Sequence, residues 1–160
     1  MNPLACKQHD HQHCIDSAVA EARRICAERR ARLTPQRELV LRLIWQSHKA
    51  LGAYPLMDML ASATTRRVAP PTVYRALDFL ADQGLIHKIH SLNAFVGCST
   101  PGRLHQSHFL ICQRCQVAVE CGATELNRAL AHTATEAGFA VQEQAVEILG
   151  LCPDCQEAQC

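Results

Sequence analysis

Residues 70–89 read PPTVYRALDFLADQGLIHKI, a stretch that combines a helix start, an amphipathic repeat and a helix stop. The two prolines suit the first helical positions, and Gly84 suits the position just past the helix end. Between them, apolar side chains recur at i, i+3, i+4 and i+7, namely at Val73, Ala76, Leu77 and Leu80. This pattern predicts an amphipathic helix with one buried face.

Two short β-prone runs follow this helix, at Leu85–Ile89 and Phe95–Cys98, and predict a β-hairpin. Upstream, apolar periodicity predicts a first helix over about Ser17–Ala31 and a short helix near Pro55–Ala61. A further helix is expected to begin at Thr34-Pro35, with the threonine as its N-cap. Short helices that end in a hairpin are typical of a winged helix, in which the last helix enters the DNA major groove.

The charge of the chain is distributed unevenly. From residue 17 to residue 90 there are 12 Lys and Arg against 6 Asp and Glu, whereas from residue 91 to residue 160 there are 3 against 7. A basic front half suggests contact with a polyanion. On charge alone, a solvated helix surface explains the asymmetry equally well.

Candidate DNA contacts lie on and around the helix that begins at residue 70. Base contacts are expected from its exposed side, at Thr72, Tyr74 and Arg75, because arginine suits bidentate recognition of guanine. Phosphate contacts are expected from Arg37, Arg66, Arg67 and Lys88. The simpler alternative is that Tyr74 only covers the core and Arg75 pairs with Asp78. The hairpin and the charge asymmetry together favour DNA contact.

Two C-x-x-C pairs, Cys112–Cys115 and Cys152–Cys155, lie in the back half with 36 residues between them. Each pair can direct two thiolates at one ion, and two such pairs complete the tetrahedral site of a structural zinc. A redox pair, an iron–sulfur cluster and disulfides are the alternatives.

The segments around these cysteines predict a small unit of β-β-α-β order. The strands are expected at Phe109–Cys112, Val117–Cys121 and Phe139–Leu151, with a helix at Thr124–Ala137. So small a unit has a thin core, for which a zinc ion and pairing with a second copy both compensate.

These signals predict an α+β chain in four parts. A mobile tail with His and Cys residues at 1–16 precedes a winged-helix DNA-binding domain at 17–92. A hinge at 93–97 leads to a small, zinc-stapled α/β dimerisation domain at 98–157. No segment reaches the roughly 20 apolar residues of a membrane span, and the N-terminus lacks the apolar core of a secretory signal. Ten cysteines without an export signal suggest a reducing compartment, so a cytoplasmic location is expected.

A second set of metal-competent side chains forms three pairs: His87 with His90, His105 with His108, and Glu120 with Cys121. In extended segments the spacing within each pair places its members on opposite sides. One ion could therefore take one member of each pair together with Cys98. A thiolate in such a mixed set shifts the preference toward zinc and away from iron(II) or manganese.

Several motifs together carry a resemblance that covers about Val19 to Cys155. They are RLTPQR at 32–37, PPTVYRALDFL at 70–80, QGLIHK at 83–88, His105-x6-Cys112-x2-Cys115, and Gly150-Leu151-Cys152-x2-Cys155. On these motifs the sequence resembles the ferric uptake regulator family, and specifically its zinc uptake regulator branch.

The resemblance implies a homodimeric repressor of zinc-uptake genes with zinc as corepressor, in which the helix from residue 70 reads an AT-rich palindromic operator. It implies two zinc ions per subunit. The structural ion is held by Cys112, Cys115, Cys152 and Cys155, and the regulatory ion by His87, Cys98, His105 and Glu120.

Two departures from the family pattern stand out. His105-Gln-Ser-His108 replaces the His-His-x-His run of the iron-sensing branch, and Gln116 stands where the family usually has glycine. A family member that senses iron, manganese or peroxide is the alternative function, followed by a zinc-storage or transfer protein. An enzyme is not expected, because no His-x-Glu occurs in the sequence and both cysteine pairs are expected beside strands, not at a helix N-terminus.

Overall fold

The computed structural model describes residues 11–64, 68–102, 107–142 and 144–157. The chain divides into two compact units, an N-terminal unit that ends at residue 103 and a C-terminal unit from residue 104 on. The hinge predicted at 93–97 is therefore wrong. Residues 94–97 form a strand of the N-terminal unit instead, because Ala94, Phe95 and Val96 are all buried there.

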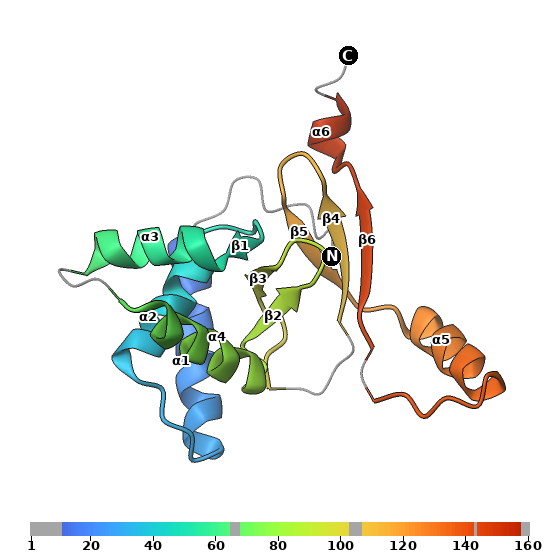
Figure 1. Ribbon diagram of the computed structural model, residues 1–160, viewed down its shortest axis with the longest axis horizontal. Helices are drawn as coiled ribbons and strands as arrows, with labels where there is room; N and C mark the ends of the chain where they lie inside the picture. The colour runs from blue at the N-terminus through green and yellow to red at the C-terminus, as the bar shows by residue number, and fades with distance from the viewer. Residues whose placement is uncertain (1–10, 65–67, 103–106, 143, 158–160) are drawn as a thin grey trace. The chain divides into compact units, whose positions relative to one another are not determined.

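The N-terminal unit combines helices with a small antiparallel sheet of order β1-β3-β2 (Figure 1). Strands β2 and β3 make the predicted hairpin, which confirms a winged helix. Its elements are α1 (His11–Glu28), α2 (Pro35–Ile44), β1 (Leu51–Gly52), α3 (Ala53–Ala63), α4 (Pro70–Asp82), β2 (Ile86–Ile89) and β3 (Ala94–Gly97).

Helix α1 begins at His11, six residues before the predicted start, so residues 11–16 are helical and not part of a mobile tail. The physical reason is Ile15, which is buried one turn before Val19 and extends the apolar stripe of the helix toward its N-terminus. The first ten residues of the predicted tail lie outside the described residues.

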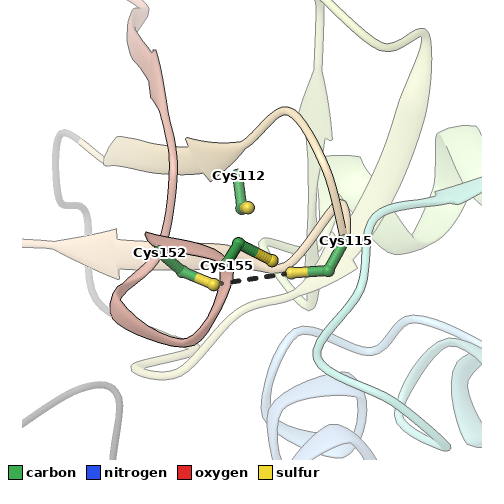
Figure 2. Close-up of side chains that lie close together, drawn as sticks. All are labelled: Cys112, Cys115, Cys152 and Cys155. Atoms are coloured by element: carbon green, nitrogen blue, oxygen red, sulfur yellow. Dashed lines mark hydrogen bonds between the residues drawn. The ribbon is translucent and has the colours of Figure 1, made fainter. Parts of the chain in front are cut away.

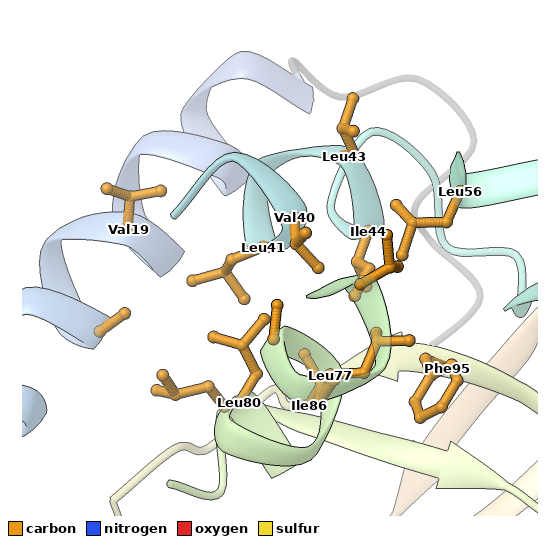
Figure 3. Packing of buried hydrophobic residues seen from close by; sticks show 14 of the residues in the cluster. Val19, Val40, Leu41, Leu43, Ile44, Leu56, Leu77, Leu80, Ile86 and Phe95 are labelled. Carbon is orange, nitrogen blue, oxygen red and sulfur yellow. The ribbon is translucent and has the colours of Figure 1, made fainter. Parts of the chain in front are cut away.

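The core of the N-terminal unit is built on the predicted stripe of α4. Its four apolar side chains are all buried, and they lie in one cluster with side chains of α2 and α3 (Figure 3). At its C-terminus, Gly84 has a φ of +67°, and the N–H of Leu85 donates to the carbonyl of Leu80. This Schellman arrangement confirms the glycine stop and fixes where the hairpin leaves the helix.

Helix α2 begins as its sequence predicts. Thr34 is extended, and its side chain accepts a hydrogen bond from the N–H of Arg37 at 3.4 Å. Pro35 occupies the first helical position, where it leaves no hydrogen bond unmade.

The C-terminal unit has the predicted β-β-α-β order followed by a short helix. Strand β4 lies in the middle of the sheet, antiparallel to β5 and parallel to β6. The last strand begins at Val146 and not at Phe139. The elements are β4 (His108–Cys112), β5 (Ala118–Cys121), α5 (Thr124–Glu136), β6 (Val146–Gly150) and α6 (Pro153–Glu157).

The C-terminal unit leaves much apolar surface uncovered. Leu110 and Ile148 are opposite each other on β4 and β6 and are 43% and 51% exposed. None of the residues of α5, all of which are described, is buried. No helix within the described residues has the length and apolar character to span a bilayer.

Candidate zinc centre and nucleic-acid interface

The four cysteines of the two C-x-x-C pairs converge at one end of the C-terminal sheet (Figure 2). Parallel pairing of β4 with β6 brings this about, because it sets Cys112 opposite Gly150 and so makes both cysteine loops leave the sheet together. All four sulfur atoms lie within 4.8 Å of one another, and those of Cys115 and Cys152 are 3.7 Å apart. Thiolates placed tetrahedrally at about 2.3 Å from zinc are separated by about 3.8 Å, so the residues fit the ion.

Backbone hydrogen bonds hold the first cysteine loop closed. The N–H of Gln116 donates to the carbonyl of Cys112, and the N–H of Cys112 donates to the carbonyl of Val117. Gln116 adopts a φ of +61° in this turn. The loop therefore keeps a left-handed residue at the position where the family usually has glycine.

The electrostatics of the cluster favour a bound cation. Burial by itself raises the pKa of Cys112, but backbone N–H groups of both loops, at Cys115 and Cys152, donate to its sulfur and lower its pKa to about 6. Burial, followed by hydrogen bonds with the neighbouring thiols, raises the pKa of Cys155 to about 12. The Cys112 thiolate thus forms readily. A divalent cation is needed before all four thiols can lose their protons, because four thiolates so close together repel one another. The cysteines are free thiols, not disulfides.

Two of the predicted regulatory ligands lie together in the N-terminal unit. His87 is on β2 and Cys98 directly follows β3, and their ligand atoms lie within 4.8 Å of each other. The Cys98 side chain is almost fully buried, at 1% exposed. In the C-terminal unit, Glu120 on β5 accepts a hydrogen bond from Ser107 Oγ at 2.7 Å. His105 lies outside the described residues.

The remaining metal-competent side chains have different surroundings. His90 is exposed just past β2. His108 is fully buried, with its Nε2 hydrogen-bonded to Asn127 Oδ1 of α5, and the Cys121 thiol donates to the His108 carbonyl. Both His108 and Cys121 therefore make hydrogen bonds within the C-terminal unit.

The predicted DNA-contacting side chains of α4 lie away from its buried stripe. Tyr74 is 41% exposed, Arg75 is exposed, and Thr72 is half-buried at the first turn. Arg75 and Asp78, both described residues, form no ion pair with each other, which removes the simpler alternative for this arginine. Lys88 is exposed on β2, whereas Arg66 and Arg67 lie outside the described residues.

Arg37 has a structural contact that the sequence did not predict. Its guanidinium lies 3.6 Å from the centroid of the Phe79 ring, and its Nη1 donates to the carbonyl of Arg32. A cation–π contact of this kind packs α2 against α4. Arg37 therefore also supports α4, and its contact with a DNA phosphate stays a prediction.

Comparison with known proteins identifies the family. Residues 28–149 match the sequence profile of the Ferric uptake regulator family. The chain belongs to this family. It is 42% identical over 142 residues to the Zinc uptake regulation protein of Escherichia coli (strain K12), a match that covers 88% of this chain and 82% of that protein.

Two solved structures agree with this membership of the ferric uptake regulator family. A "Zinc Uptake Regulator Complexed With Zinc AND DNA" has a TM-score of 0.86 and 41% identity, covering 91% of this chain and 97% of that chain. A "Crystal structure of holo XcZur" has a TM-score of 0.79 and 46% identity, covering 88% and 98%. Both confirm the order of winged helix and α/β unit.

This member of the ferric uptake regulator family also has supporting residues that sequence reasoning missed. Arg114 Nη1 donates to the carbonyl of Cys155 at 2.9 Å and so joins the two cysteine loops. Ser107 donates a hydrogen bond that orients Glu120. No local signal marks these two residues, because each acts through a partner distant in sequence.

Proposed function

We propose that this protein is a zinc-responsive, DNA-binding transcriptional repressor of zinc-uptake genes, with zinc as its corepressor. The observation that carries the proposal is its similarity, along nearly the whole chain, to a zinc uptake regulator complexed with zinc and DNA. The four-cysteine cluster and the exposed side of α4 support it from the residues themselves. As a member of this family, the chain is a transcription regulator and not an enzyme.

The DNA-binding part of the proposal assigns α4 to the major groove. Thr72, Tyr74 and Arg75 would contact base edges, while Lys88, with Arg37, Arg66 and Arg67, would contact phosphates. Two copies related by two-fold symmetry place their reading helices about 34 Å apart, one helical turn of DNA. A palindromic operator follows from that symmetry, and its AT-rich character follows from the family resemblance.

A homodimer is supported by the surface of the C-terminal unit. The exposed pair formed by Leu110 and Ile148 belongs to an apolar sheet face that a single copy leaves in water. A second copy of the same face would bury it.

We propose two zinc ions per subunit, one for each ligand set. The four-thiolate site suits a permanent structural ion. The mixed site of His87, Cys98, His105 and Glu120 suits a reversible one, because imidazole and carboxylate ligands hold zinc less tightly than four thiolates. The adjacency of His87 and Cys98 supports this second assignment.

The proposed response to zinc is a linkage between metal and DNA binding. The regulatory ligands come from both units, so sharing one ion would restrict how the two units move relative to each other. The dimer would then spend more time with both α4 helices placed for successive major grooves. Operator affinity rises by the differential affinity of zinc for that pose, typically about 1–3 kcal/mol or about 5–150-fold.

The test is operator binding by metal-depleted protein across buffered zinc, iron(II) and manganese. We expect zinc to restore binding at the lowest free concentration. Cys98→Ser should keep the dimer and the structural zinc but lose this response, while Cys14→Ser serves as the matched control. A preferential response to iron(II) or manganese would identify a different sensor of the same family. If the purified protein binds zinc but does not bind DNA at any metal concentration, it is a storage protein.

A further inference from the structure

Gly97, the last residue of β3, is in close contact with the indole ring of Trp45. A side-chain carbon at position 97 would lie 2.2 Å from Cε2 and 2.5 Å from Nε1 of that ring, far inside van der Waals distance. The φ of Gly97 is not in the left-handed region, so the backbone itself does not require glycine. Since glycine weakens a strand, its presence here is explained by the close approach of the ring.

The Trp45 ring has little freedom to move aside. Trp45 is the C-cap of α2, and its N–H donates to the carbonyl of Leu41 at 3.1 Å. Its ring packs against the hydrophobic core, and its centroid lies 6.4 Å from that of His48 in an edge-on arrangement. The strand and the ring therefore hold each other in position.

Cys98 is the next residue along the chain. Its N–H donates to the carbonyl of Leu85 at 3.0 Å, and its ligand atom lies within 4.8 Å of that of His87. The register of β2 and β3 ends at Gly97, which is opposite Ile86. The backbone at Cys98 is thus held by the hydrogen bond to Leu85, and the residue before it is in close contact with Trp45.

We propose that the contact between Trp45 and Gly97 positions Cys98 and thereby sets the zinc affinity of the regulatory site. This inference rests on the proposed function, in which Cys98 and His87 are zinc ligands. It also links the metal-binding strand to α2, the helix that packs against α4 through Arg37 and Phe79. Trp45 and Gly97 are positioning residues, because neither offers a ligand atom to the ion.

The test compares Gly97→Ala, Trp45→Leu and the double variant in the full-length protein that retains its structural zinc. Zinc affinity is measured by competition with a chromogenic chelator, and the half-maximal zinc concentration is measured for operator binding. Each single variant should weaken both by about 10–100-fold, as loss of a group that orients a ligand does. The double variant should recover most of the loss, because removing the ring makes room for the methyl group.

Independent measurements distinguish a displaced Cys98 from a general loss of folding. Structural zinc content and operator affinity at saturating zinc should change little, even where the altered packing lowers the melting temperature. Trp45 is the only tryptophan, so its emission should shift in metal-depleted Gly97→Ala if the methyl displaces the ring. Gly52→Ala on β1 is the matched control, because its added carbon meets Pro55 only at an ordinary 3.5 Å.

The possible results test the proposed function and the positioning inference separately. If operator binding by the unaltered protein ignores zinc, the proposed function fails before any variant is compared. If the unaltered protein responds and Gly97→Ala binds zinc equally well, the positioning inference is wrong. Additive losses in the double variant also overturn it. Should Gly97→Ala fail to fold, Trp45→Leu alone must weaken zinc affinity, and an unchanged affinity refutes the inference.

Discussion

At the scale of single residues, the backbone conformation of Gln116 affects the stability of the first cysteine loop. It holds a φ of +61° in the turn that closes the first cysteine loop. A left-handed conformation costs an L-residue about 1–2 kcal/mol, while glycine adopts it freely. We expect Gln116→Gly to raise the unfolding free energy of the zinc-loaded protein by up to about 1 kcal/mol, after glycine's greater chain entropy is subtracted. Thermal unfolding measures this.

Gln113 provides the matched control for Gln116→Gly. It is the same residue type in the same loop, but it is not among the described residues with a positive φ. Gln113→Gly should therefore be neutral or destabilising. Equal effects of the two substitutions would show that the turn stores no strain at Gln116.

At the scale of elements, α4 is held at its end as well as along its buried stripe. Arg29, just after α1, donates from Nη1 to the carbonyl of Gln83, the C-cap residue of α4, at 2.8 Å. A cation at this end also complements the helix dipole. This contact joins two helices that are distant in the sequence, and it fixes the end from which the hairpin departs.

Removing that contact should loosen the C-terminal end of α4. We expect Arg29→Ala to lower the unfolding free energy by about 0.5–1 kcal/mol, a modest value because the contact is exposed to solvent. Chemical denaturation measures the change. Arg30→Ala removes the same charge one residue later and is the control. If both substitutions cost the same, the effect comes from net charge and not from the contact with Gln83.

Element boundaries show where sequence signals succeed. The cap of α2 and the stripe and glycine stop of α4 are predictable because they depend on neighbours within one or two turns. The start of α1 was mispredicted because Ile15 is buried by the rest of the unit, which no local pattern reveals. The local β-prone run at Phe95–Cys98 did predict strand β3, and the error was to place the hinge over the same residues.

At the scale of the whole molecule, we expect the two units to depend on zinc to different extents. The large apolar cluster belongs entirely to the N-terminal unit, with members from Ile15 to Phe95. In the C-terminal unit, the cysteine cluster itself supplies two of the buried side chains, Cys112 and Cys155. A structural zinc contributes about 10–16 kcal/mol of binding free energy, so its loss should unfold one unit selectively.

Cys112→Ser tests this dependence. We expect the variant to lose the structural zinc and to lose amide hydrogen-exchange protection in the C-terminal unit, while the core helices of the N-terminal unit stay protected. Cys121→Ser, in the same unit but outside the cluster, should keep both zinc and protection. Equal loss of protection in both units would contradict this division.

The proposed dimerisation is a second property of the whole molecule. We expect Leu110→Glu to produce monomers, because a charge in the middle of the apolar sheet face cannot be buried against a second copy. Light scattering after size-exclusion chromatography measures the mass. Ala61→Glu, on the exposed side of α3, is the control and should remain dimeric. A dimeric Leu110→Glu would place the interface elsewhere.

The sequence by itself determined the winged helix, the two cysteine pairs and the family, because caps, helical periodicity and C-x-x-C spacing are local signals. Only the tertiary structure decided that parallel pairing of β4 with β6 gathers the four sulfurs, that Arg37 packs on Phe79, and that Gly97 makes room for Trp45. Each of these depends on atoms far apart in the chain, and their meeting is set by packing, which local sequence patterns do not record.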